Sequence, residues 1–451
     1  MSSSLTIFWH RRDLRILDNA GLYRALKAGG TVQPIFIFDR EILDQLPKKD
    51  ARVEFIHRSV TELAAAYQAH GSDLWVFYGK PVNVWQTLLQ DHDVDAIYTN
   101  RDYEPYAIAR DKAVADVAQS VGASFLDFKD HLIFESDEVQ KKAGGPYTVY
   151  TPYWRTWRAR LDERTSTHEG ESISYYLKPY PTEKYAAALQ QEKAPHPIPS
   201  LQDMGFAPTE IEIPSTEVSR GLIRKYDKTR NFPGIEGTSK LGIHFRHGTI
   251  SIREKALRAL SLNETYLKEL VWRDFYANIL QAFPYVVEGP FRKEYAAIPW
   301  RNNEEEFARW CSGTTGVPIV DAGMRQLNES GWMHNRVRMI VASYLTKHLL
   351  IDWRWGEAYF AEKLLDYELA SNNGGWQWAA GCGTDAQPYF RIFNYDSQQK
   401  KFDKDFAYVK AWIPEYGTQE YPSEPLVEHK VGRERALKVY KEALAEAKGN
   451  K

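Results

Sequence analysis

The part of the chain best equipped to do chemistry is the run from Ser371 to Asn394, which brings amides, glycines, tryptophans and one arginine close together. Its first residues, 371–378, read Ser-Asn-Asn-Gly-Gly-Trp-Gln-Trp. Glycine lets a backbone approach a flat ligand closely, and neighbouring indoles offer faces for stacking or electron exchange. The run therefore predicts either a binding site or a tight turn between two aromatic core helices.

Four further polar and aromatic side chains share one face of a predicted helix. They stand at i, i+3, i+4 and i+7 and are Glu269, Trp272, Arg273 and Tyr276. Burying such groups costs free energy unless each finds a partner. The face predicts contact with a polar ligand or, alternatively, a network of ion pairs between helices.

A third group occupies residues 331–339. It aligns an indole, an amide and a thioether, with two guanidinium groups beside them: Trp332, Asn335, Met339, Arg336 and Arg338. Amides and guanidinium groups can bind other amides and phosphates, while Trp and Met form a soft apolar wall. His334, taken alone, predicts a satisfied core histidine rather than a ligand.

The loop 234–242 reads Gly-Ile-Glu-Gly-Thr-Ser-Lys-Leu-Gly and lies in a basic region. Its backbone amides and Lys240 can balance the charge of a phosphate, although it lacks Walker A spacing and a helix-capping turn is the alternative. Residues 220–273 contain 12 Lys or Arg against 5 Asp or Glu, whereas the whole chain has a formal net charge of -2. This local excess predicts a patch that can bind nucleic acid.

Composition excludes several classes of protein. A chain of 451 residues exceeds one ordinary core, so we expect two or three domains. Cys311 and Cys382 are the only cysteines and have no metal-ligand spacing, so we expect a reduced, cytoplasmic protein without a metal site. Because no apolar stretch approaches membrane-spanning length and the start lacks a signal-peptide pattern, we expect neither secretion nor membrane contact.

The elements that position these residues fall into three regions, the first of which is 1–130. Strands are predicted near 5–9, 32–38, 74–78, 96–98 and 124–128, and helices near 19–28, 54–70, 81–91 and 105–121. This alternation predicts an α/β N-terminal domain with a five-stranded parallel, doubly wound sheet. The first strand is followed by charged residues at 9–15 instead of a dinucleotide-binding glycine fingerprint, which predicts a ligand site at that sheet edge or ion pairs with local carboxylates.

The second and third regions differ in pattern. Prolines accumulate across 131–205, which predicts an interdomain connector over the surface, with Tyr147 to Trp157 able to dock on a neighbouring domain. Helical periodicity dominates 206–451 and predicts an all-α C-terminal domain.

Together these pieces resemble the DNA photolyase and cryptochrome family along almost the full chain, and most closely its class I-like members that repair cyclobutane pyrimidine dimers. The stretches that carry the resemblance are 13–15, 237–241, 272–276, 331–339 and 372–394. The resemblance implies an antenna-binding α/β domain, a connector, and a helical domain that binds DNA and holds FAD in a U-shaped conformation.

The resemblance also implies a cofactor pocket for FAD, which is fully reduced in the active state. Asn372 would lie against flavin N5, where its amide can donate or accept a hydrogen bond. The other residues implied to line the pocket are Tyr226, Thr238, Ser239, Lys240, Leu241, Gly242, Arg273, Trp332, Asn335, Arg338, Asp366 and Glu368.

Substrate roles are implied in the same way. A dimer flipped out of the duplex would be clamped by two indoles and would pack against a thioether. The residues implied at the lesion are Glu269, Trp272, Asn335, Arg336, Met339 and Trp378. Those implied at the flanking DNA are Arg230, Arg336, Arg391 and Gln398, and those implied to carry electrons from the surface to the flavin are Trp300, Trp353 and Trp376.

The implied activity is that of a carbon–carbon lyase, in which photoexcited reduced FAD lends an electron to the dimer while its cyclobutane bonds split. Plant-type cryptochromes usually carry aspartate where this chain has Asn372, and relatives that repair (6-4) photoproducts carry paired histidines where it has His334-Asn335. The alternative is a cryptochrome-type blue-light receptor without repair activity. Ala107 stands where folate-carrying relatives have glutamate, so it stays open whether a folate, a deazaflavin, a second flavin or no antenna at all is bound. We expect a monomer whose partner is ultraviolet-damaged DNA.

Overall fold

The computed structural model describes residues 4–163, 165–168, 171–191, 195–422 and 424–449. The chain forms two compact units, named here the α/β unit and the helical unit. The α/β unit comprises Met1–Glu138, Trp157–Thr216 and Leu241–Arg258, and the helical unit comprises Val139–Thr156, Glu217–Lys240 and Ala259–Lys451. Each unit therefore draws on three separate stretches of the chain.

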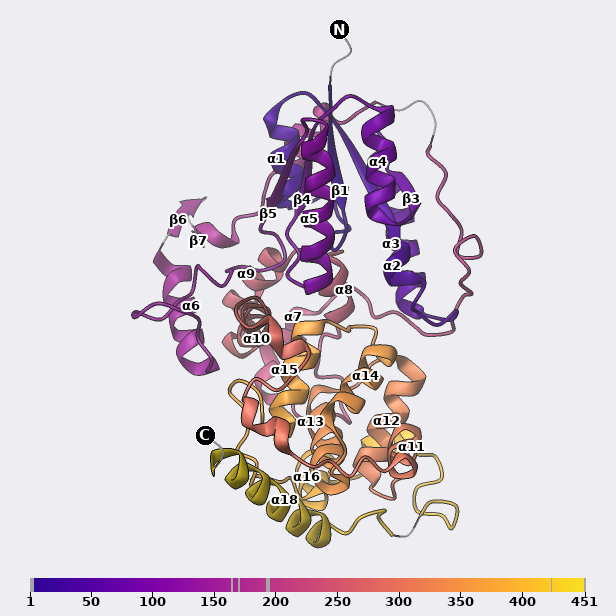
Figure 1. Ribbon diagram of the computed structural model, residues 1–451, viewed down its shortest axis with the longest axis vertical. Helices are drawn as coiled ribbons and strands as arrows, with labels where there is room; N and C mark the ends of the chain where they lie inside the picture. Colours follow the sequence, from indigo (N-terminus) through magenta and orange to yellow (C-terminus); the bar gives the residue numbers. More distant parts are fainter. Residues whose placement is uncertain (1–3, 164, 169–170, 192–194, 423, 450–451) are drawn as a thin grey trace. The chain divides into compact units, whose positions relative to one another are not determined.

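Five parallel strands form the sheet of the α/β unit (Figure 1). Their order is β3-β2-β1-β4-β5, and their bounds are β1 Leu5–His10, β2 Thr31–Asp39, β3 Trp75–Gly79, β4 Val94–Asn100 and β5 Ser124–Phe128. In register, Leu5 of β1 lies beside Thr31 of β2. The predicted α/β class with a five-stranded parallel sheet is confirmed, and every predicted strand end lies within two residues of the observed one.

Alternation along the strands divides the core of this unit into two apolar layers. Phe8 of β1 packs with α1 (Ala20–Ala28) and α3 (Ala51–Gln68), whereas its neighbours Ile7 and Trp9 pack with α4 and α5 on the opposite face. The bounds of the remaining helices are α2 Arg40–Leu43, α4 Pro81–Asp91, α5 Pro105–Ser120, α8 Gly242–His247 and α9 Ile252–Leu262. Helices α4 and α5 lie in front of the sheet in Figure 1.

The charged residues that follow β1 find partners inside the α/β unit. Their carboxylates are Asp111 for Arg11, Asp102 for Arg12 and Asp130 for Arg15. Burial favours the neutral acid, yet Arg15 and Arg253 lower the pKa of Asp130 to about 2. Of the two possibilities for this cluster, ion pairs with local carboxylates are confirmed.

The connector contains more regular structure than its prolines predict. Helix α6 spans Tyr150–Glu163, and a two-stranded antiparallel sheet joins β6 (Thr165–His168) to β7 (Glu171–Ser174). The short helices η1 Tyr175–Leu177 and η2 Thr182–Ala188 follow. The sequence analysis missed α6 because Pro152 stands in its first turn, where a missing N–H removes no helical hydrogen bond.

The helical unit confirms the predicted all-α region. Its elements are α7 Arg220–Thr229, α10 Glu264–Ala282, η3 Pro284–Val287, η4 Lys293–Ala297, α11 Glu304–Ser312, α12 Pro318–Ser330, α13 Asn335–Ser343, the π-helix η5 Tyr344–Leu349, α14 Trp353–Lys363, α15 Leu369–Ala380, α16 Tyr395–Phe402, α17 Ala407–Trp412 and α18 His429–Gly449. Its core includes the buried indoles of Trp310, Trp353 and Trp376. Within the described residues, no helix is both long and apolar enough to cross a membrane.

Two histidines, one buried and one partly exposed, link η5 to the start of α18. His348 is 1% exposed, and its Nε2 lies 2.9 Å from Nδ1 of His429. Burial and the neighbouring His429 lower the pKa of His348 to about 3, so the folded protein keeps the ring neutral at mildly acidic pH. The unfolded chain protonates the same ring near its ordinary pKa of about 6.5.

We predict that the free energy of unfolding falls as the pH drops below about 6.5, because only the unfolded chain then gains a proton at His348. The loss from this one group is about 1.4 kcal/mol for each pH unit below that value, until the folded ring itself titrates. Denaturant unfolding at pH 7.5, 6.5 and 5.5 measures it. The slope with pH should be shallower in His348→Asn, and an equal slope in both proteins would contradict the prediction.

Candidate functional site

Helices of the helical unit bring the predicted functional segments together. Helix α10 packs against α7 and α15, and α15 also packs against α13 and α14. Residues 371–378 lie within α15, so the alternative of a tight turn at these residues is wrong. The chain turns only after α15, at Gly381, which ends the helix in the left-handed conformation.

The predicted face of α10 is helical throughout. The helix begins at an Asn263 N-cap, whose side chain accepts hydrogen bonds from the backbone of Thr265 and Tyr266. On this face Glu269 forms an ion pair with Arg230. Burial raises the pKa of the Glu269 carboxyl in spite of that guanidinium, so the group keeps a proton more readily than an ordinary glutamate.

Aromatic rings hold Trp272, the next residue of that face. The Tyr150 ring lies flat on the indole, with centroids 3.6 Å apart and planes 6° from parallel. Tyr276 lies 5.5 Å away at an angle of 29°. A Cβ atom at Gly374 would lie 2.2 Å from Cδ1 of Tyr276, so this glycine is required for the packing of α10 on α15.

Helix α13 begins at His334, which acts as its N-cap. The His334 Nδ1 accepts a hydrogen bond from the backbone N–H of Arg336 at 3.1 Å. Burial and the neighbouring Arg336 and Arg338 lower the pKa of His334 to about 4, so the imidazole is neutral at physiological pH. His334 is buried, as expected of a core histidine, but only its Nδ1 is satisfied, because Nε2 is buried without a hydrogen-bond partner among the described residues.

Two arginines expected at the cofactor are held by carboxylates. Arg338 Nη2 donates to both oxygens of Asp366, at 3.1 and 2.9 Å, while its Nε donates to the backbone carbonyl of Met333. Arg273 lies 3.5 Å from Glu368. Each guanidinium is therefore fixed in direction before any ligand arrives.

Arg336 occupies a crowded, partly buried position. Its Nη2 donates to Asn231 Oδ1 at 2.7 Å, its Nη1 lies 3.4 Å from the Met339 sulfur, and its guanidinium lies over the Phe402 ring. Burial and the nearby charge of Arg230 lower the pKa of Arg336. Arg230 and Arg336 thus share the single carboxylate of Glu269, which leaves this corner of the helical unit positively charged.

The predicted phosphate loop, residues 234–242, belongs to the helical unit as far as Lys240. Ser239 Oγ accepts a hydrogen bond from the Tyr266 hydroxyl at 3.0 Å, and Tyr266 packs edge-on against Tyr226. Lys240 adopts a left-handed backbone conformation with φ 53° and lies 5.0 Å from the Trp332 ring centroid. Thr238 is partly buried, and the last two predicted residues, Leu241 and Gly242, lead into α8 of the α/β unit.

Asn372 is tied to α14 through its amide nitrogen. Its Nδ2 donates to the backbone carbonyl of Glu357 at 3.1 Å, so its oxygen is directed elsewhere. Asn373 Nδ2 lies 3.0 Å from Glu357 Oε1, and burial raises the pKa of the Glu357 carboxyl to about 7. The sequence analysis missed Glu357, because nothing in its spacing singles out this glutamate among those of α14.

The three predicted electron carriers belong to the aromatic core or its margin. Trp376 and Trp353 are buried, whereas Trp300 is partly exposed and meets Tyr440 edge-on. Gly356 makes room for Trp376, because a Cβ there would lie 2.1 Å from Cη2 of the indole. The Trp376 ring also contacts Trp310 at 6.0 Å, a neighbour that the sequence analysis did not single out.

The remaining predicted residues stand apart from this network of contacts. Asn335 and Arg391 are exposed, and Trp378 and Gln398 are partly buried. Among the described residues, no hydrogen bond or ion pair joins the side chains of Asn335, Arg391 or Gln398 to the charged cluster around Glu269. Without such contacts, these residues could act together with that cluster only through a ligand that binds both.

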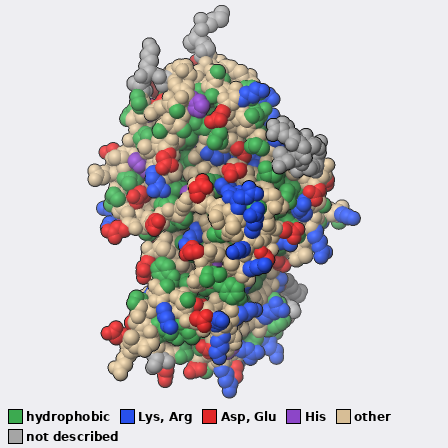
Figure 2. All heavy atoms as spheres, turned by 180° about the vertical axis from the view of Figure 1, so that it is seen from behind, with side chains coloured by type: hydrophobic (Ala, Val, Ile, Leu, Met, Phe, Trp, Pro, Cys, Tyr) green, Lys and Arg blue, Asp and Glu red, His purple; other side chains and the backbone are tan. Residues whose placement is uncertain are grey.

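The basic region does not form one free surface. Arg246 pairs with Glu104 and Arg253 bridges Asp18 and Asp130 inside the α/β unit, while Arg230 pairs with Glu269 in the helical unit. Figure 2 shows cationic and anionic side chains interspersed on the visible face. The local excess of positive charge is therefore partly consumed by internal ion pairs.

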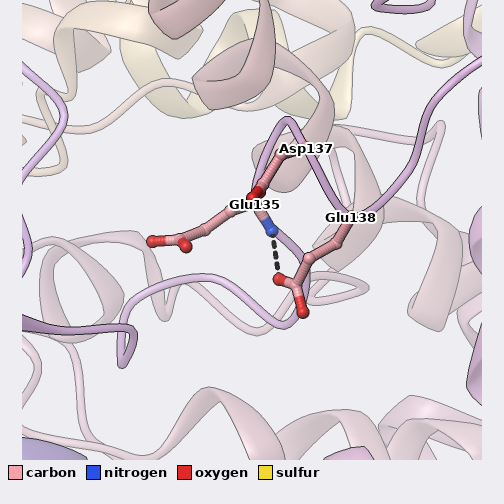
Figure 3. A group of neighbouring side chains, drawn as sticks. All are labelled: Glu135, Asp137 and Glu138. Carbon is pink, nitrogen blue, oxygen red and sulfur yellow. Dashed lines mark hydrogen bonds between the residues drawn. The ribbon is translucent and has the colours of Figure 1, made fainter. Parts of the chain in front are cut away.

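One acidic group has the spacing of a metal site, in the α/β unit. Glu135, Asp137 and Glu138 lie close together, and Glu138 accepts a hydrogen bond from the backbone of Glu135 (Figure 3). Arg101 lies 2.6 Å from Glu135 and Lys129 lies 2.5 Å from Glu138. Protein cations therefore already pair with two of these three carboxylates, Glu135 and Glu138.

Comparisons with known proteins all find photolyases. A family model described as DNA photolyase matches residues 6–171, and one described as the FAD binding domain of DNA photolyase matches residues 266–419. The chain is 37% identical to the deoxyribodipyrimidine photo-lyase of a Synechococcus species, over 98% of each chain.

Solved structures agree with these matches. A bacterial class III photolyase from Agrobacterium tumefaciens has a TM-score of 0.83 and 33% identity, covering 98% of both chains. An archaeal photolyase from Sulfolobus tokodaii, described with two FAD molecules, has a TM-score of 0.79 and 33% identity, covering 97% of this chain and all of that one.

The donors of the helical unit suit a flavin dinucleotide. The guanidinium group of Arg273, the ammonium group of Lys240 and the hydroxyls of Thr238 and Ser239 are groups that bind phosphates and ribityl oxygens. The side-chain oxygen of Asn372 takes no part in the hydrogen bond to Glu357, so it can accept a hydrogen bond from a ring N–H. The residues present therefore fit FAD.

We predict that Arg338→Ala lowers FAD retention, because it removes a guanidinium that is expected to line the cofactor pocket and leaves the Asp366 carboxylate without its ion-pair partner. The expected change in the FAD dissociation constant is about tenfold or more. The ratio of flavin to protein absorbance after gel filtration measures it. The control is Arg325→Ala, which breaks the ion pair between Arg325 of α12 and Glu415 and should retain FAD. Equal loss of FAD in both variants would contradict the prediction.

Proposed function

The chain belongs to the DNA photolyase family, and we propose that it repairs cyclobutane pyrimidine dimers in DNA as a light-dependent deoxyribodipyrimidine photo-lyase. The observation that carries the proposal is the clustering of Glu269, Trp272, Arg336 and Met339 in the helical unit of a chain with photolyase relatives over its full length. These residues supply a carboxyl whose pKa is raised by burial, an aromatic face, a cation and a soft apolar contact.

The cofactor carries the redox chemistry. Bound FAD, when fully reduced and excited by light, supplies an electron that opens the cyclobutane ring and then returns. The protein contributes binding, orientation and the exclusion of water around the reacting groups.

Lesion recognition depends on extruding the dimer from the duplex, which costs less for a damaged pair than for an intact one. Trp272 and Trp378 would stack on the extruded bases, and Met339 would pack against them. Glu269 would form a hydrogen bond to one polar edge of the pyrimidines. Asn335, exposed at the start of α13, would bond to the other polar edge.

Flanking DNA would be held by cations of the helical unit. Arg336, Arg230 and Arg391 would bind phosphates, with Gln398 as a neutral donor beside them. Such contacts position the duplex and make affinity dependent on salt without identifying the lesion. The damaged bases must therefore be recognised by the aromatic and polar groups around Glu269.

Asn372 would act as a hydrogen-bond acceptor toward the flavin. Its nitrogen is already used by the Glu357 carbonyl, so its oxygen can accept from the N–H at position 5 of the reduced ring. Trp376, Trp353 and Trp300 would return electrons from the surface to an oxidised cofactor, with the partly exposed Trp300 at the solvent end.

The remaining expectations are proposals of the same kind. We propose an antenna-binding domain at 1–130, a connector at 131–205 and a FAD- and DNA-binding domain at 206–451, in a cytoplasmic monomer. The second chromophore would be a flavin, a folate or a deazaflavin, and the Sulfolobus relative described with two FAD molecules favours a flavin. In the absorption spectrum of the purified protein, a folate or a deazaflavin would add a band beyond that of FAD, whereas a second flavin would raise the ratio of flavin to protein to two.

We predict that the purified protein with reduced FAD removes thymine dimers from ultraviolet-treated oligonucleotides under blue light. Repair is followed by recovery of absorbance at the wavelength where intact thymine absorbs and dimers do not. The same mixture in darkness is the control. Intact dimers after illumination of fully reduced protein would overturn the proposed function.

We predict that Trp353→Phe separates electron supply from repair. Phenylalanine keeps most of the packing in the core but is far harder to oxidise, so light-driven reduction of the oxidised cofactor should fall at least tenfold. Repair by protein reduced chemically beforehand should stay near the wild-type rate. Equal loss of both activities would mean that Trp353 acts only through packing.

A further inference from the structure

Tyr150 forms the closest ring pair among the described residues. Its ring lies 3.6 Å from that of Trp272 and only 6° from parallel, so the two rings overlap face to face. Both residues belong to the helical unit, although Tyr150 comes from the connector and Trp272 from α10. The contact joins residues that lie more than a hundred positions apart in the sequence.

The tyrosine is anchored at its hydroxyl as well as its ring. Its OH donates to the backbone carbonyl of Lys268, which precedes Trp272 by one helical turn, at 2.6 Å. The Tyr150 residue is only 7% exposed, and the edge of its ring meets Phe275. Burial raises the pKa of the phenol, so this hydroxyl stays a donor throughout the physiological range.

Further contacts fix the segment that carries Tyr150. The backbone carbonyl of Thr148 accepts a hydrogen bond from the N–H of Asp385 at 3.1 Å, in the loop that leads to Arg391. One turn after Tyr150, the Tyr153 hydroxyl accepts from Asn278 Nδ2 of α10 at 2.8 Å. The segment is therefore pinned both to α10 and to the loop that follows α15.

Trp272 is not fully covered by its aromatic neighbours. Tyr276 contacts it at 5.5 Å and at a 29° tilt, and Trp272 as a whole is partly exposed. Tyr276 itself cannot shift toward α15 because it already lies against Gly374. One side of Trp272 is thus backed by Tyr150, while part of the ring stays available to a ligand.

We propose that Tyr150 is a positioning residue for lesion recognition, which backs Trp272 and fixes the indole in the orientation that receives an extruded pyrimidine dimer. The inference rests on the proposed function. A fixed indole loses little conformational entropy when a base stacks on it, so the backing ring increases affinity for the dimer. Undamaged DNA bound through phosphates does not use the indole, so its affinity is independent of Tyr150.

Binding in darkness to two oligonucleotides, one with a single thymine dimer and one undamaged, tests the proposal. For Tyr150→Ala we expect about tenfold weaker binding of the dimer, as for the loss of one stacking contact, with less than about twofold change for undamaged DNA. Tyr150→Phe keeps the backing ring and should restore dimer binding to within about threefold of wild type. Tyr147→Ala, on the same segment, is the matched control and should bind as wild type.

Three results would overturn the proposal. Unchanged dimer binding in Tyr150→Ala would mean that Trp272 needs no backing, and tighter binding would mean that Tyr150 covers the face on which the lesion stacks. Equal loss on both oligonucleotides would assign Tyr150 a role in general folding or DNA contact. The melting temperature and the FAD content of each variant are measured alongside, and Tyr150→Leu replaces the Ala variant if that protein does not fold.

Failure of this inference is distinguishable from failure of the proposed function. If wild-type protein repairs dimers under blue light while Tyr150→Ala binds them normally, only the role of Tyr150 is lost. If wild-type protein repairs nothing, the proposed function itself is wrong.

Discussion

The contact between α10 and α15 at Gly374 is the constraint on which the site depends. A side chain at this position would collide with Tyr276, so only glycine lets the two helices approach as they do. With 3.6 residues per turn, the contact also sets the direction of every other side chain on α15. Trp378 stands one turn from Gly374 and lies on nearly the same face, toward α10. Asn372 and Trp376 stand two residues before and after it and share the opposite face.

Contacts with α14 agree with that geometry. Asn372 donates to the Glu357 carbonyl, and the Trp376 ring lies against Gly356 and Phe360, all on α14. One face of α15 therefore offers an indole toward the aromatic face of α10, and the other buries an amide and an indole against α14. A single helix can serve a ligand on one side and electron supply on the other because its period separates the two sets.

Desolvation shifts the pKa values of the charged residues around Glu269. Burial raises the pKa of Glu269, an effect that Arg230 opposes, and burial lowers the pKa of Arg336, which nevertheless stays a cation. Groups desolvated in this way can exchange hydrogen bonds with uncharged base edges at less cost than fully hydrated ions. The same low polarity strengthens each bond once water has been excluded.

The sequence predicted regular structure well and tertiary partners poorly. Helix α4 begins and ends at the predicted residues because Pro81 and a strong apolar repeat mark it, and the polar face of α10 follows directly from its spacing. Tyr150 and Glu357 could not be found in this way, since their partners lie at distant or unpatterned positions and only the fold brings them together. Helix α6 is obscured in the sequence for a different reason, because its Pro152 stands in the first turn, where proline does not break a helix.

Counting charges in the sequence does not predict which of them stay exposed in the fold. The excess of Lys and Arg over 220–273 correctly indicates a cationic segment, but the fold directs Arg246 and Arg253 to buried carboxylates of the α/β unit. What stays exposed on α7 is a smaller set, formed by Arg220, Arg224, Lys225 and Lys228. Because only solvent-facing cations release counterions from DNA, the salt dependence of binding reports this smaller set rather than the sequence count. Discrimination of damaged from intact DNA must then come from the uncharged groups, and above all from how rigidly the indole of Trp272 is held.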